Sequence, residues 1–440
     1  HLSVSGASSC QLENTIVADN KGRDATQVSS CSAVNCCLPA TDIGANGNSC
    51  VLCVSGSPMF LNANSANYNL LAGSPCIDAG SSAFKLGTYD YVGRTRLYGS
   101  AMDIGPYEWS ISSPSISKDV EGKGPFGTIW YVTKSGNDSN TGKSETAAFL
   151  TIQKAIDTSS AGDKIIVSDG TYSPIATANK KLWIESKNGA AKTKIDGGGT
   201  ARCATLGSDL SHVNTTLKGF TLQNGLAQNN LGGGGAFAGF LINCRIQNNK
   251  AGHKSYTNYG NGGGARGGWL YQCIVTGNSL LGDTTAYHSG GGVSEATVVH
   301  CTIANNSATA SQCSVGGAYK CVMYNTIIAD NTGSCSLQGC TLMYCSLPQA
   351  DDSVNGNTTS WCITGSPMML DSQNGNYRLL SISPCVDAAS TAFTWGTTDY
   401  AEKCRKVGES VDIGAYEWYE GSPSVSIDVD GTGSFGTTWY

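Results

Sequence analysis

A short repeat between residues 215 and 350 sets the narrowest limits on how this chain can fold. Each copy has a Cys or Thr anchor, an aliphatic residue two positions later and an Asn five positions later, as in Cys244, Ile246 and Asn249. A glycine, Gly235 in this copy, stands nine residues before the anchor. Further copies start at the anchors Cys273, Cys301 and Thr326, with Val275, Ile303 and Ile328 as aliphatic residues and Asn278, Asn306 and Asn331 as asparagines.

The alternation of anchor and aliphatic residue predicts a short β-strand in each copy, and the Asn predicts a turn. A coil of about 25 residues cannot bury its own apolar face, whereas stacked coils share one continuous core. We therefore predict an all-β fold, a parallel β-helix solenoid, with strands about 4.8 Å apart along its axis. The anchors should form one inward column, the aliphatic residues a second, and the asparagines a ladder of mutually bonded amides. A column of cysteines also suits a metal or redox centre, but small buried apolar side chains are the simpler interpretation.

A longer repeat covers most of the chain and includes its own junction. Three motifs return 309 residues later (412 − 103 = 309): Asp103–Trp109 as Asp412–Trp418, Gly56–Met59 as Gly365–Met368, and Phe126–Thr128 as Phe435–Thr437. This repeat predicts β-helix units of 309 residues in tandem, a pattern typical of an array or a fibre.

The long repeat divides the chain into four parts. Residues 1–112 are predicted to be the C-terminal part of a first β-helix unit, 113–127 a linker, 128–420 a complete unit, and 421–440 a linker with the start of a further unit or a docking arm. In the complete unit, Thr151 is predicted to cap a short helix that covers the first coil with Ile152, Ala155 and Ile156. Residues 365–418 lose the short repeat and are predicted to close and cap the other end.

Composition excludes some partners and favours one location. Only 14% of residues are charged, the net charge is -6 and no basic run occurs, so nucleic acid is not an expected partner. No stretch approaches about 18 uninterrupted apolar residues, so no membrane span is expected in this segment. The 19 cysteines show no spacing typical of zinc ligands. So many cysteines favour an extracellular or cell-surface location.

Two cysteine pairs are predicted to form disulfides. Cys321 and Cys340 each lie five residues before an anchor position, so they occupy one column on adjacent coils. Cys10 and Cys31 repeat this arrangement in the first unit. Neighbouring residues of stacked coils have Cα atoms about 5 Å apart, within the range of a disulfide. The pairing of a second set stays open at this point: Cys53, Cys76, Cys362 and Cys385.

The start and the end of the complete unit resemble a known bacterial family. Residues 131–140, 151–157 and 162–172 are similar to the opening of right-handed parallel β-helix repeat proteins. The ending, through Ser383–Ala388 and Asp412–Trp418, resembles the choice-of-anchor Q domain. The resemblance implies a right-handed solenoid in a secreted or surface-attached protein, and it implies no particular activity.

The β-helix fold also hosts polysaccharide lyases and hydrolases, so a catalytic site has to be sought among individual residues. Asp283, Glu295 and Asp330 share no column, and Asp351–Asp352 is interpreted as a solvated loop rather than a calcium site. His300 precedes an anchor and is interpreted as a polar ladder residue, as are Asn243, Gln272 and Asn325 in other coils. We predict no catalytic residue, no enzyme activity and no cofactor; a structural calcium in loop 137–139 is the one alternative, and a hydrogen-bonded turn is the simpler interpretation there.

The main functional prediction is a non-catalytic protein that builds an extracellular fibre, stalk or surface layer from end-to-end copies of itself. A first alternative is a glycan-binding surface adhesin. Its sugar-stacking face would be formed by Tyr256, Tyr259, Trp269, Tyr271 and Tyr287. A second alternative is a polysaccharide lyase or a glycoside hydrolase, which needs clustered carboxylates.

Overall fold

The computed structural model contains two compact units, His1–Lys118 and Asp119–Tyr440. It describes residues 6–18, 20, 26–55, 57–62, 67–70, 74–84, 88–91, 96–97, 101–108, 120–228, 232–252, 261–281, 288–308, 314–420 and 422. Each unit is considered by itself below.

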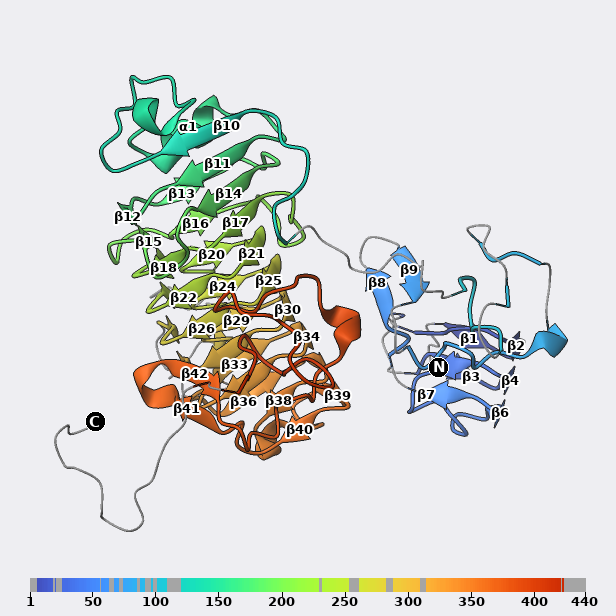
Figure 1. The fold of residues 1–440 in the computed structure, drawn as a ribbon. Coiled ribbons are helices and arrows are strands. Elements are labelled where there is room, and N and C mark those ends of the chain that lie inside the picture. The colour runs from blue at the N-terminus through green and yellow to red at the C-terminus, as the bar shows by residue number, and fades with distance from the viewer. Residues whose placement is uncertain are drawn as a thin grey trace, which may run out of the picture. The chain divides into compact units, whose positions relative to one another are not determined.

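Most of the second unit is a right-handed parallel β-helix, as predicted from the sequence (Figure 1). Each coil contributes short strands to sheets that run along the axis, and each long sheet is named here after its first strand. The β10 sheet contains β10 (Ile129–Val132), β11 (Lys164–Val167), β14 (Trp183–Ser186), β17 (Thr216–Lys218), β21 (Phe240–Ile242), β25 (Trp269–Tyr271), β30 (Thr297–Val299), β34 (Val322–Tyr324), β37 (Thr341–Met343) and β39 (Thr358–Ser360). The β12 sheet contains β12 (Gly170–Tyr172), β15 (Thr193–Asp196), β18 (Thr221–Gln223), β22 (Arg245–Gln247), β26 (Ile274–Thr276), β31 (Thr302–Ala304), β35 (Ile327–Ala329), β38 (Ser346–Leu347) and β40 (Ile363–Thr364).

Two further sheets complete the coils. The β13 sheet contains β13 (Ile175–Ala176), β16 (Ala204–Thr205), β20 (Ala236–Phe237), β24 (Ala265–Arg266), β29 (Val293–Ser294), β28 (His288–Ser289), β33 (Ser314–Tyr319) and β36 (Cys335–Gln338). The β19 sheet contains β19 (Leu226–Ala227), β23 (Lys250–Ala251), β27 (Ser279–Leu280) and β32 (Ser307–Ala308).

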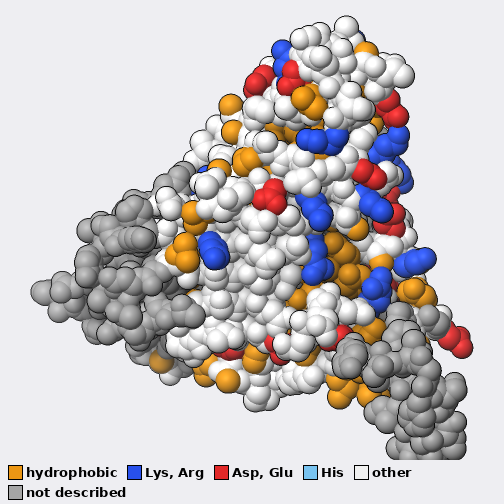
Figure 2. Space-filling model, turned by 90° about the vertical axis from the view of Figure 1, so that its left-hand side faces the viewer, with side chains coloured by type: hydrophobic (Ala, Val, Ile, Leu, Met, Phe, Trp, Pro, Cys, Tyr) orange, Lys and Arg blue, Asp and Glu red, His pale blue; other side chains and the backbone are white. Residues whose placement is uncertain are grey.

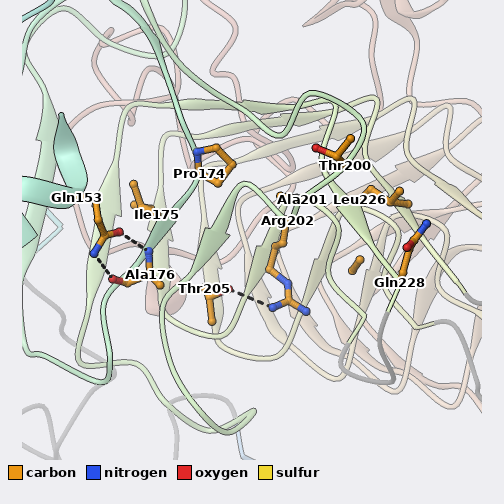
Figure 3. Close-up of a pocket in the computed structure, with 11 residues that line it drawn as sticks. Gln153, Pro174, Ile175, Ala176, Thr200, Ala201, Arg202, Thr205, Leu226 and Gln228 are labelled. Carbon is orange, nitrogen blue, oxygen red and sulfur yellow. Dashed lines mark hydrogen bonds between the residues drawn. The ribbon is translucent and has the colours of Figure 1, made fainter. Parts of the chain in front are cut away.

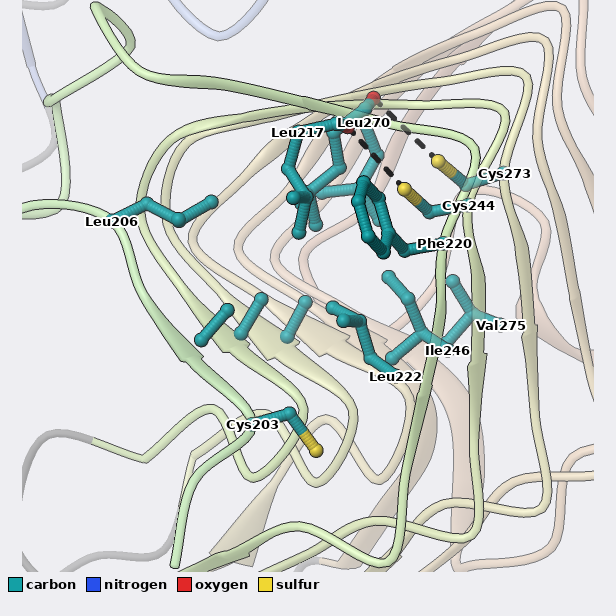
Figure 4. Packing of buried hydrophobic residues seen from close by; sticks show 14 of the residues in the cluster. Cys203, Leu206, Leu217, Phe220, Leu222, Cys244, Ile246, Leu270, Cys273 and Val275 are labelled. Carbon is teal, nitrogen blue, oxygen red and sulfur yellow. Dashed lines mark hydrogen bonds between the residues drawn. The ribbon is translucent and has the colours of Figure 1, made fainter. Parts of the chain in front are cut away.

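The strand register stacks equivalent side chains into columns. Ile246 pairs with Leu222 on one side and with Val275 on the other, and the column continues through Ile303 to Ile328. All of these side chains are buried in one core that fills the interior of the coils (Figure 4). Since side chains alternate between the two faces of a strand, the residues on either side of each core position point outward.

The cysteine anchors lie at the corner between the β10 and β12 sheets. Cys244, Cys273 and Cys301 are fully buried among apolar side chains, and Figure 4 shows the first two of them. Cys244 Sγ donates to Leu217 O and to Ile242 O, both at 3.3 Å. Among the residues that the structure describes, no group of three or more His, Cys, Asp or Glu side chains is placed to hold a metal ion.

The asparagines form a ladder along the next turn. Asn249 Nδ2 donates to Asn278 Oδ1 at 3.0 Å, Asn278 Nδ2 to Asn306 Oδ1 at 2.9 Å, and Asn306 Nδ2 to Asn331 Oδ1 at 3.0 Å. A Cβ atom added at Gly235 would lie 2.8 Å from Asn249 Nδ2. The glycine nine residues before each anchor is therefore required because the ladder passes so close to the backbone.

The residue before each anchor turns the corner between the two sheets with a left-handed backbone. The φ angle is 48° at Asn243, 51° at Gln272, 50° at His300 and 49° at Asn325. Asn adopts this conformation more readily than most residues, whereas Gln and His are less usual there. Their side chains point outward, where a later part of the chain binds them.

The N-terminal cap agrees with the sequence-based prediction. Helix α1 (Ile152–Thr158) begins after Thr151, whose side chain accepts from Lys154 N, and it buries Ile152, Ala155 and Ile156 against the first coil. Asp163 joins the first coil to β10, because its carboxylate accepts from Thr128 N and from Trp130 Nε1, both at 2.8 Å.

The C-terminal part differs from the prediction of an end cap. Residues 365–418, called the strap here, fold back along the outside of the coils (Figure 1). Its hairpin, β41 (Met369–Asp371) and β42 (Asn376–Leu379), covers the β12 sheet, where Tyr377 packs on Ile274. Its later part covers the β10 sheet, where Trp395 stacks on Tyr271 with ring centroids 4.9 Å apart. The short repeat does not predict the position of the strap, because the strap's partners lie far earlier in the sequence, as Tyr271 does for Trp395 at a separation of 124 residues.

Short single-turn helices occur in the strap and the loops. They are η2 (Ser82–Phe84), η3 (Glu145–Ala147), η4 (Gln349–Asp351), η5 (Ser372–Asn374) and η6 (Thr391–Phe393). Across the described ranges, no helix is both long enough and apolar enough to cross a membrane.

The first unit repeats the contacts of the second at the 309-residue offset. Its strands are β1 (Ala7–Ser8), β2 (Gln11–Glu13), β3 (Val28–Ser29), β4 (Ser32–Val34), β5 (Cys37–Leu38), β6 (Ser49–Val51), β7 (Val54–Ser55), β8 (Phe60–Asn62) and β9 (Asn67–Leu70). Asn14 Nδ2 donates to Ser81 O as Asn325 Nδ2 donates to Ser390 O (325 − 14 = 309). Gly105 and Gly414 both adopt positive φ angles, 102° and 108°, and both leave no room for a Cβ beside an isoleucine of the coil. The residues of the first unit that correspond to the strap therefore bind their coils as the strap binds those of the second unit.

Candidate functional site

The strap leaves one part of the β12 sheet uncovered. Outward residues of the later coils, such as Ile274 and Ile327, are fully buried beneath the strap. The outward residues of β15 and β22, and Gln223 of β18, remain partly exposed instead. We call this surface the β12 face, and its side chains are Lys194, Asp196, Gln223, Arg245 and Gln247. Figure 2 views this side of the second unit, where Lys and Arg side chains gather next to hydrophobic ones.

A chain of hydrogen bonds fixes the polar side chains of the β12 face. Gln223 Nε2 donates to Asp196 Oδ2 at 2.7 Å, and Gln247 Nε2 donates to Gln223 Oε1 at 3.3 Å. Arg245 Nε donates in turn to Gln247 Oε1 at 2.5 Å. Burial tends to raise the pKa of Asp196, but the hydrogen bonds from Gln223 and from Gly198 N outweigh it and the pKa is lowered. Asp196 is thus ionised and already accepts hydrogen bonds, so it is poorly suited to proton transfer.

The edge of the strap adds aromatic and basic groups beside this polar chain. The Arg245 guanidinium carbon lies 6.0 Å from the centre of the Tyr377 ring, and the Tyr377 hydroxyl is 2.6 Å from Thr276 Oγ1. The Arg378 guanidinium carbon lies 4.9 Å from the centre of the Tyr416 ring. The sheet supplies Arg245 and the strap supplies Arg378, so folding of the strap assembles the site.

The charges of Arg245 and Arg378 both affect the pKa of the Tyr416 phenol. Burial raises the pKa of Tyr416, while the charges of Arg378 and Arg245 oppose that rise. Neither Arg245 nor Arg378 has a carboxylate within ion-pair distance in the described part of the chain. Two partly exposed positive charges therefore lie over the buried rings of Tyr377 and Tyr416, an arrangement suited to binding an anion.

A second polar cluster looks catalytic in composition but is buried beneath the strap. His300 is fully buried and hydrogen-bonds with Arg405, with Thr394 Oγ1 at 2.9 Å and with Asn325 Nδ2 at 3.0 Å. Burial and the Arg405 charge hold the pKa of His300 well below its usual range. The interpretation of His300 as an outward polar ladder residue fits its position, and its partners show that it holds the strap.

A shallow groove of about 590 Å³ lies elsewhere, along β13 and β16 (Figure 3). Arg202 crosses it and donates to Thr205 Oγ1 at 3.1 Å and to Gly233 O at 2.9 Å. Burial, together with the Arg266 charge, lowers the pKa of Arg202 to about 10. The lining also includes Gln153 and Leu226, and its described residues hold no carboxylate or histidine. The groove consequently supplies no acid–base pair.

Two acidic groups singled out in the sequence are hydrogen-bonded parts of the framework. Asp351 is almost fully buried and accepts from Ser336 N at 3.2 Å and from Leu337 N at 3.3 Å, so the interpretation of a solvated loop is wrong for this residue. Asp42, its counterpart in the first unit, accepts from Val28 N at 2.9 Å. Asp138 in the cap loop accepts from Leu150 N at 2.8 Å and from Thr151 Oγ1 at 2.8 Å, as a hydrogen-bonded turn requires.

The predicted sugar-stacking face is only partly described. Tyr256, Tyr259 and Tyr287 lie outside the described residues. Tyr271 is fully buried beneath the strap, and its hydroxyl accepts from Trp395 N at 3.0 Å and from Gly396 N at 3.1 Å. Its ring is therefore not available to a sugar. The sequence analysis missed the β12 face because only the strap brings Arg378 and Tyr416 to it.

The cysteines predicted to pair lie on adjacent coils as free thiols. Cys10 Sγ and Cys31 Sγ are 3.4 Å apart, and Cys321 N donates to Cys340 Sγ at 3.4 Å. Both disulfides stay predictions. The four cysteines whose pairing the sequence does not decide do not lie next to one another. Cys53 neighbours Cys36, Cys76 neighbours Cys37, Cys362 neighbours Cys345, and Cys385 neighbours Ser346.

Comparison with known proteins finds similarity in fold only. No protein-family model and no curated protein matches it. A pectate lyase is similar in structure over 67% of this chain and 97% of its own, with 12% identity and a TM-score of 0.37. A pectin methylesterase from carrot matches over 54% and 79%, with 11% identity and a TM-score of 0.32. A lacto-N-biosidase from Eubacterium ramulus matches over 53% and 57%, with 11% identity and a TM-score of 0.30.

These matches correct one prediction. The chain was expected not to be an enzyme, yet the similar solved structures are named as a lyase, an esterase and a glycosidase. The absence of a clustered carboxylate motif in the sequence is therefore no ground for a non-catalytic protein, and that prediction is withdrawn. The resemblance to the choice-of-anchor Q domain has no counterpart among the matches.

Proposed function

We propose that the chain binds an acidic polysaccharide on the β12 face and acts on it as a lyase. The observation that carries the proposal is the pair Arg245 and Arg378, two guanidinium groups from different segments that share the Tyr416 phenol and have no described carboxylate partner. A guanidinium group binds a carboxylate through two parallel hydrogen bonds, and it remains charged at any physiological pH.

The arrangement favours elimination over hydrolysis. Hydrolysis of a glycosidic bond needs two carboxyl groups about 5 to 9.5 Å apart. The β12 face supplies only Asp196, which Gln223 and Asn224 already occupy. In elimination, neutralising the sugar carboxylate makes the adjacent C–H bond more acidic. A base takes that proton, a C=C bond forms as the C–O bond to the next sugar breaks, and the departing sugar oxygen takes up a proton from water. Arg245 and Arg378 would neutralise the carboxylate, and water would accept the proton, because burial raises the pKa of Tyr416 despite the two opposing charges.

Binding and cleavage are measured separately. Affinity electrophoresis in gels that contain polygalacturonate or alginate should retard the chain, and gels with a neutral glucan should not. Ultraviolet absorbance should rise as unsaturated sugar ends form. Arg245→Gln and Arg378→Gln should each weaken retardation about tenfold or more, since a charge-assisted hydrogen bond contributes about 1.5 to 3 kcal/mol.

Lys181→Gln is the matched control. Lys181 is exposed and lies just before β14, on a different sheet, so the variant removes one positive charge without touching the β12 face. Its binding should equal that of the unchanged chain. Equal retardation by neutral and acidic gels would overturn the proposal, whereas retardation without any rise in absorbance would leave a binding protein and remove the lyase reaction.

A further inference from the structure

Two cysteine pairs occur at the same place in both units. Strand β5 pairs with β7 through Cys37 and Val54, and Val54 N donates to Cys36 O at 2.8 Å, so Cys36 lies directly above Cys53. Strand β38 pairs with β40 through Ser346 and Ile363, and Ile363 N donates to Cys345 O at 2.9 Å, so Cys345 lies directly above Cys362. The offset is again 309 (345 − 36 = 309 and 362 − 53 = 309).

The two cysteines of each pair lie at matching positions of adjacent coils. Stacked coils are about 4.8 Å apart, which lies within the Cα separation of disulfides. Burial raises the pKa of the Cys345 and Cys36 thiols, and the adjacent thiols of Cys362 and Cys53 raise it further. These four residues join the last coil of each unit to the coil before it.

Solvent reaches these pairs but not the cysteine column above them. Cys53 and Cys362 are half-buried, whereas Cys244, Cys273 and Cys301 are fully buried. The last coil also has a neighbour on one side only, so it lacks half of the hydrogen bonds and contacts that hold an inner coil. A covalent link at this coil stabilises the part of the stack most exposed to local opening.

We propose that Cys36–Cys53 and Cys345–Cys362 are oxidation sites that close as disulfides and lock the last coil of each unit. The oxidant is a small-molecule disulfide such as oxidised glutathione. The thiolate of the half-buried cysteine attacks one sulfur of the oxidant and releases one thiol. The thiolate of its buried neighbour then attacks the mixed disulfide and releases the second thiol. Two protein thiols are thereby oxidised and one oxidant disulfide is reduced to two thiols.

The pairing is tested by peptide mapping of the whole chain. The protein is equilibrated with oxidised glutathione or with a reductant, free thiols are alkylated after denaturation, and the digest is analysed by mass spectrometry. We expect linked peptides that contain Cys36 with Cys53 and Cys345 with Cys362 in the oxidised sample only. Alkylation of all four in the oxidised sample, or linkage of Cys362 to any other cysteine, would overturn the proposal.

A matched variant separates the two pairs. In Cys362→Ser the linkage of Cys345 should be lost while the Cys36–Cys53 peptide persists, which shows that the variant chain still folds its first unit. Oxidation should raise the thermal midpoint of the second unit by a few degrees more in the unchanged chain than in Cys362→Ser. A similar rise in both would contradict a stabilising role of this pair. The outcome does not depend on any glycan activity.

Discussion

At the scale of single residues, the asparagine ladder is where the sequence was most informative. Asn278 Nδ2 donates to Ile246 O at 2.8 Å and to Asn306 Oδ1 at 2.9 Å, and its own Oδ1 accepts from Asn249 N and from Asn249 Nδ2, both at 3.0 Å. A residue that recurs at a fixed offset from a buried anchor has the same surroundings in each coil, so its partners can be inferred without a structure. The ladder could be predicted because each of its bonds joins equivalent positions.

Asn278→Ala should lower the free energy of unfolding by about 3 kcal/mol, because it removes four hydrogen bonds and leaves buried polar partners unsatisfied. Chemical denaturation of the whole chain measures the change. Asn248→Gly is the control, since Asn248 is exposed and has a φ angle of 55° that glycine readily adopts. It should change the stability by less than about 0.5 kcal/mol. Equal effects of the two variants would show that the ladder contributes little.

Residues with non-equivalent partners were harder to interpret. His300 and Asn325 occupy matching corner positions, yet one contacts Arg405 and the other Ser390. The sequence predicts a solvated loop at Asp351, whereas its carboxylate accepts hydrogen bonds from backbone amides of the preceding coil. The contacts of these residues are with segments that do not follow the short repeat, so the repeat cannot predict them.

At the scale of elements, the strap connects the fold to the candidate site. Its inner surface is polar and buried: Arg405 Nη2 donates to Gly414 O at 2.8 Å and to Asp412 O at 2.9 Å, and Arg405 Nε lies 3.9 Å from Glu417 Oε2. Burial, with the Asp412 carboxylate, raises the pKa of Glu417 to about 8. Since Arg378 and Tyr416 belong to the same segment, the geometry of the β12 face depends on this buried network.

Stability should depend on pH through Glu417. Its pKa is about 4.5 in the unfolded chain and about 8 in the folded chain, so its contribution is fully present below pH 4.5 and is lost as the pH rises through 8. Thermal unfolding should therefore show a midpoint that falls by a few degrees between pH 5 and pH 8. Glu417→Gln cannot ionise and should flatten this dependence. An equally steep decline in the variant would assign the effect to other groups.

At the scale of the whole molecule, the 309-residue repeat predicts that each unit is a folding unit of its own, but it does not locate the boundary. The sequence placed residues 113–127 in a linker. In the structure, Val120 is buried, Glu121 Oε1 accepts from Thr397 Oγ1 at 2.7 Å, and the rings of Phe126 and Trp183 lie 5.8 Å apart. Residues 120–127 thus pack on the second unit. A polar, glycine-rich segment gives no periodic signal, so its docking could not be foreseen.

Two fragments that differ only in this segment test its contribution. Residues 119–440 retain every contact of Val120, Glu121 and Phe126 and should unfold at the midpoint that the second unit has in the full chain, as followed by far-ultraviolet circular dichroism. Residues 128–440 lose those contacts and should unfold several degrees lower, because an aromatic pair contributes about 0.5 to 1.5 kcal/mol and a charge-assisted hydrogen bond about 1.5 to 3 kcal/mol. If both fragments matched the full chain, residues 120–127 would be a linker after all. If both fell below it, the second unit would depend on the first, and an array would be cooperative along its length rather than a row of independent units.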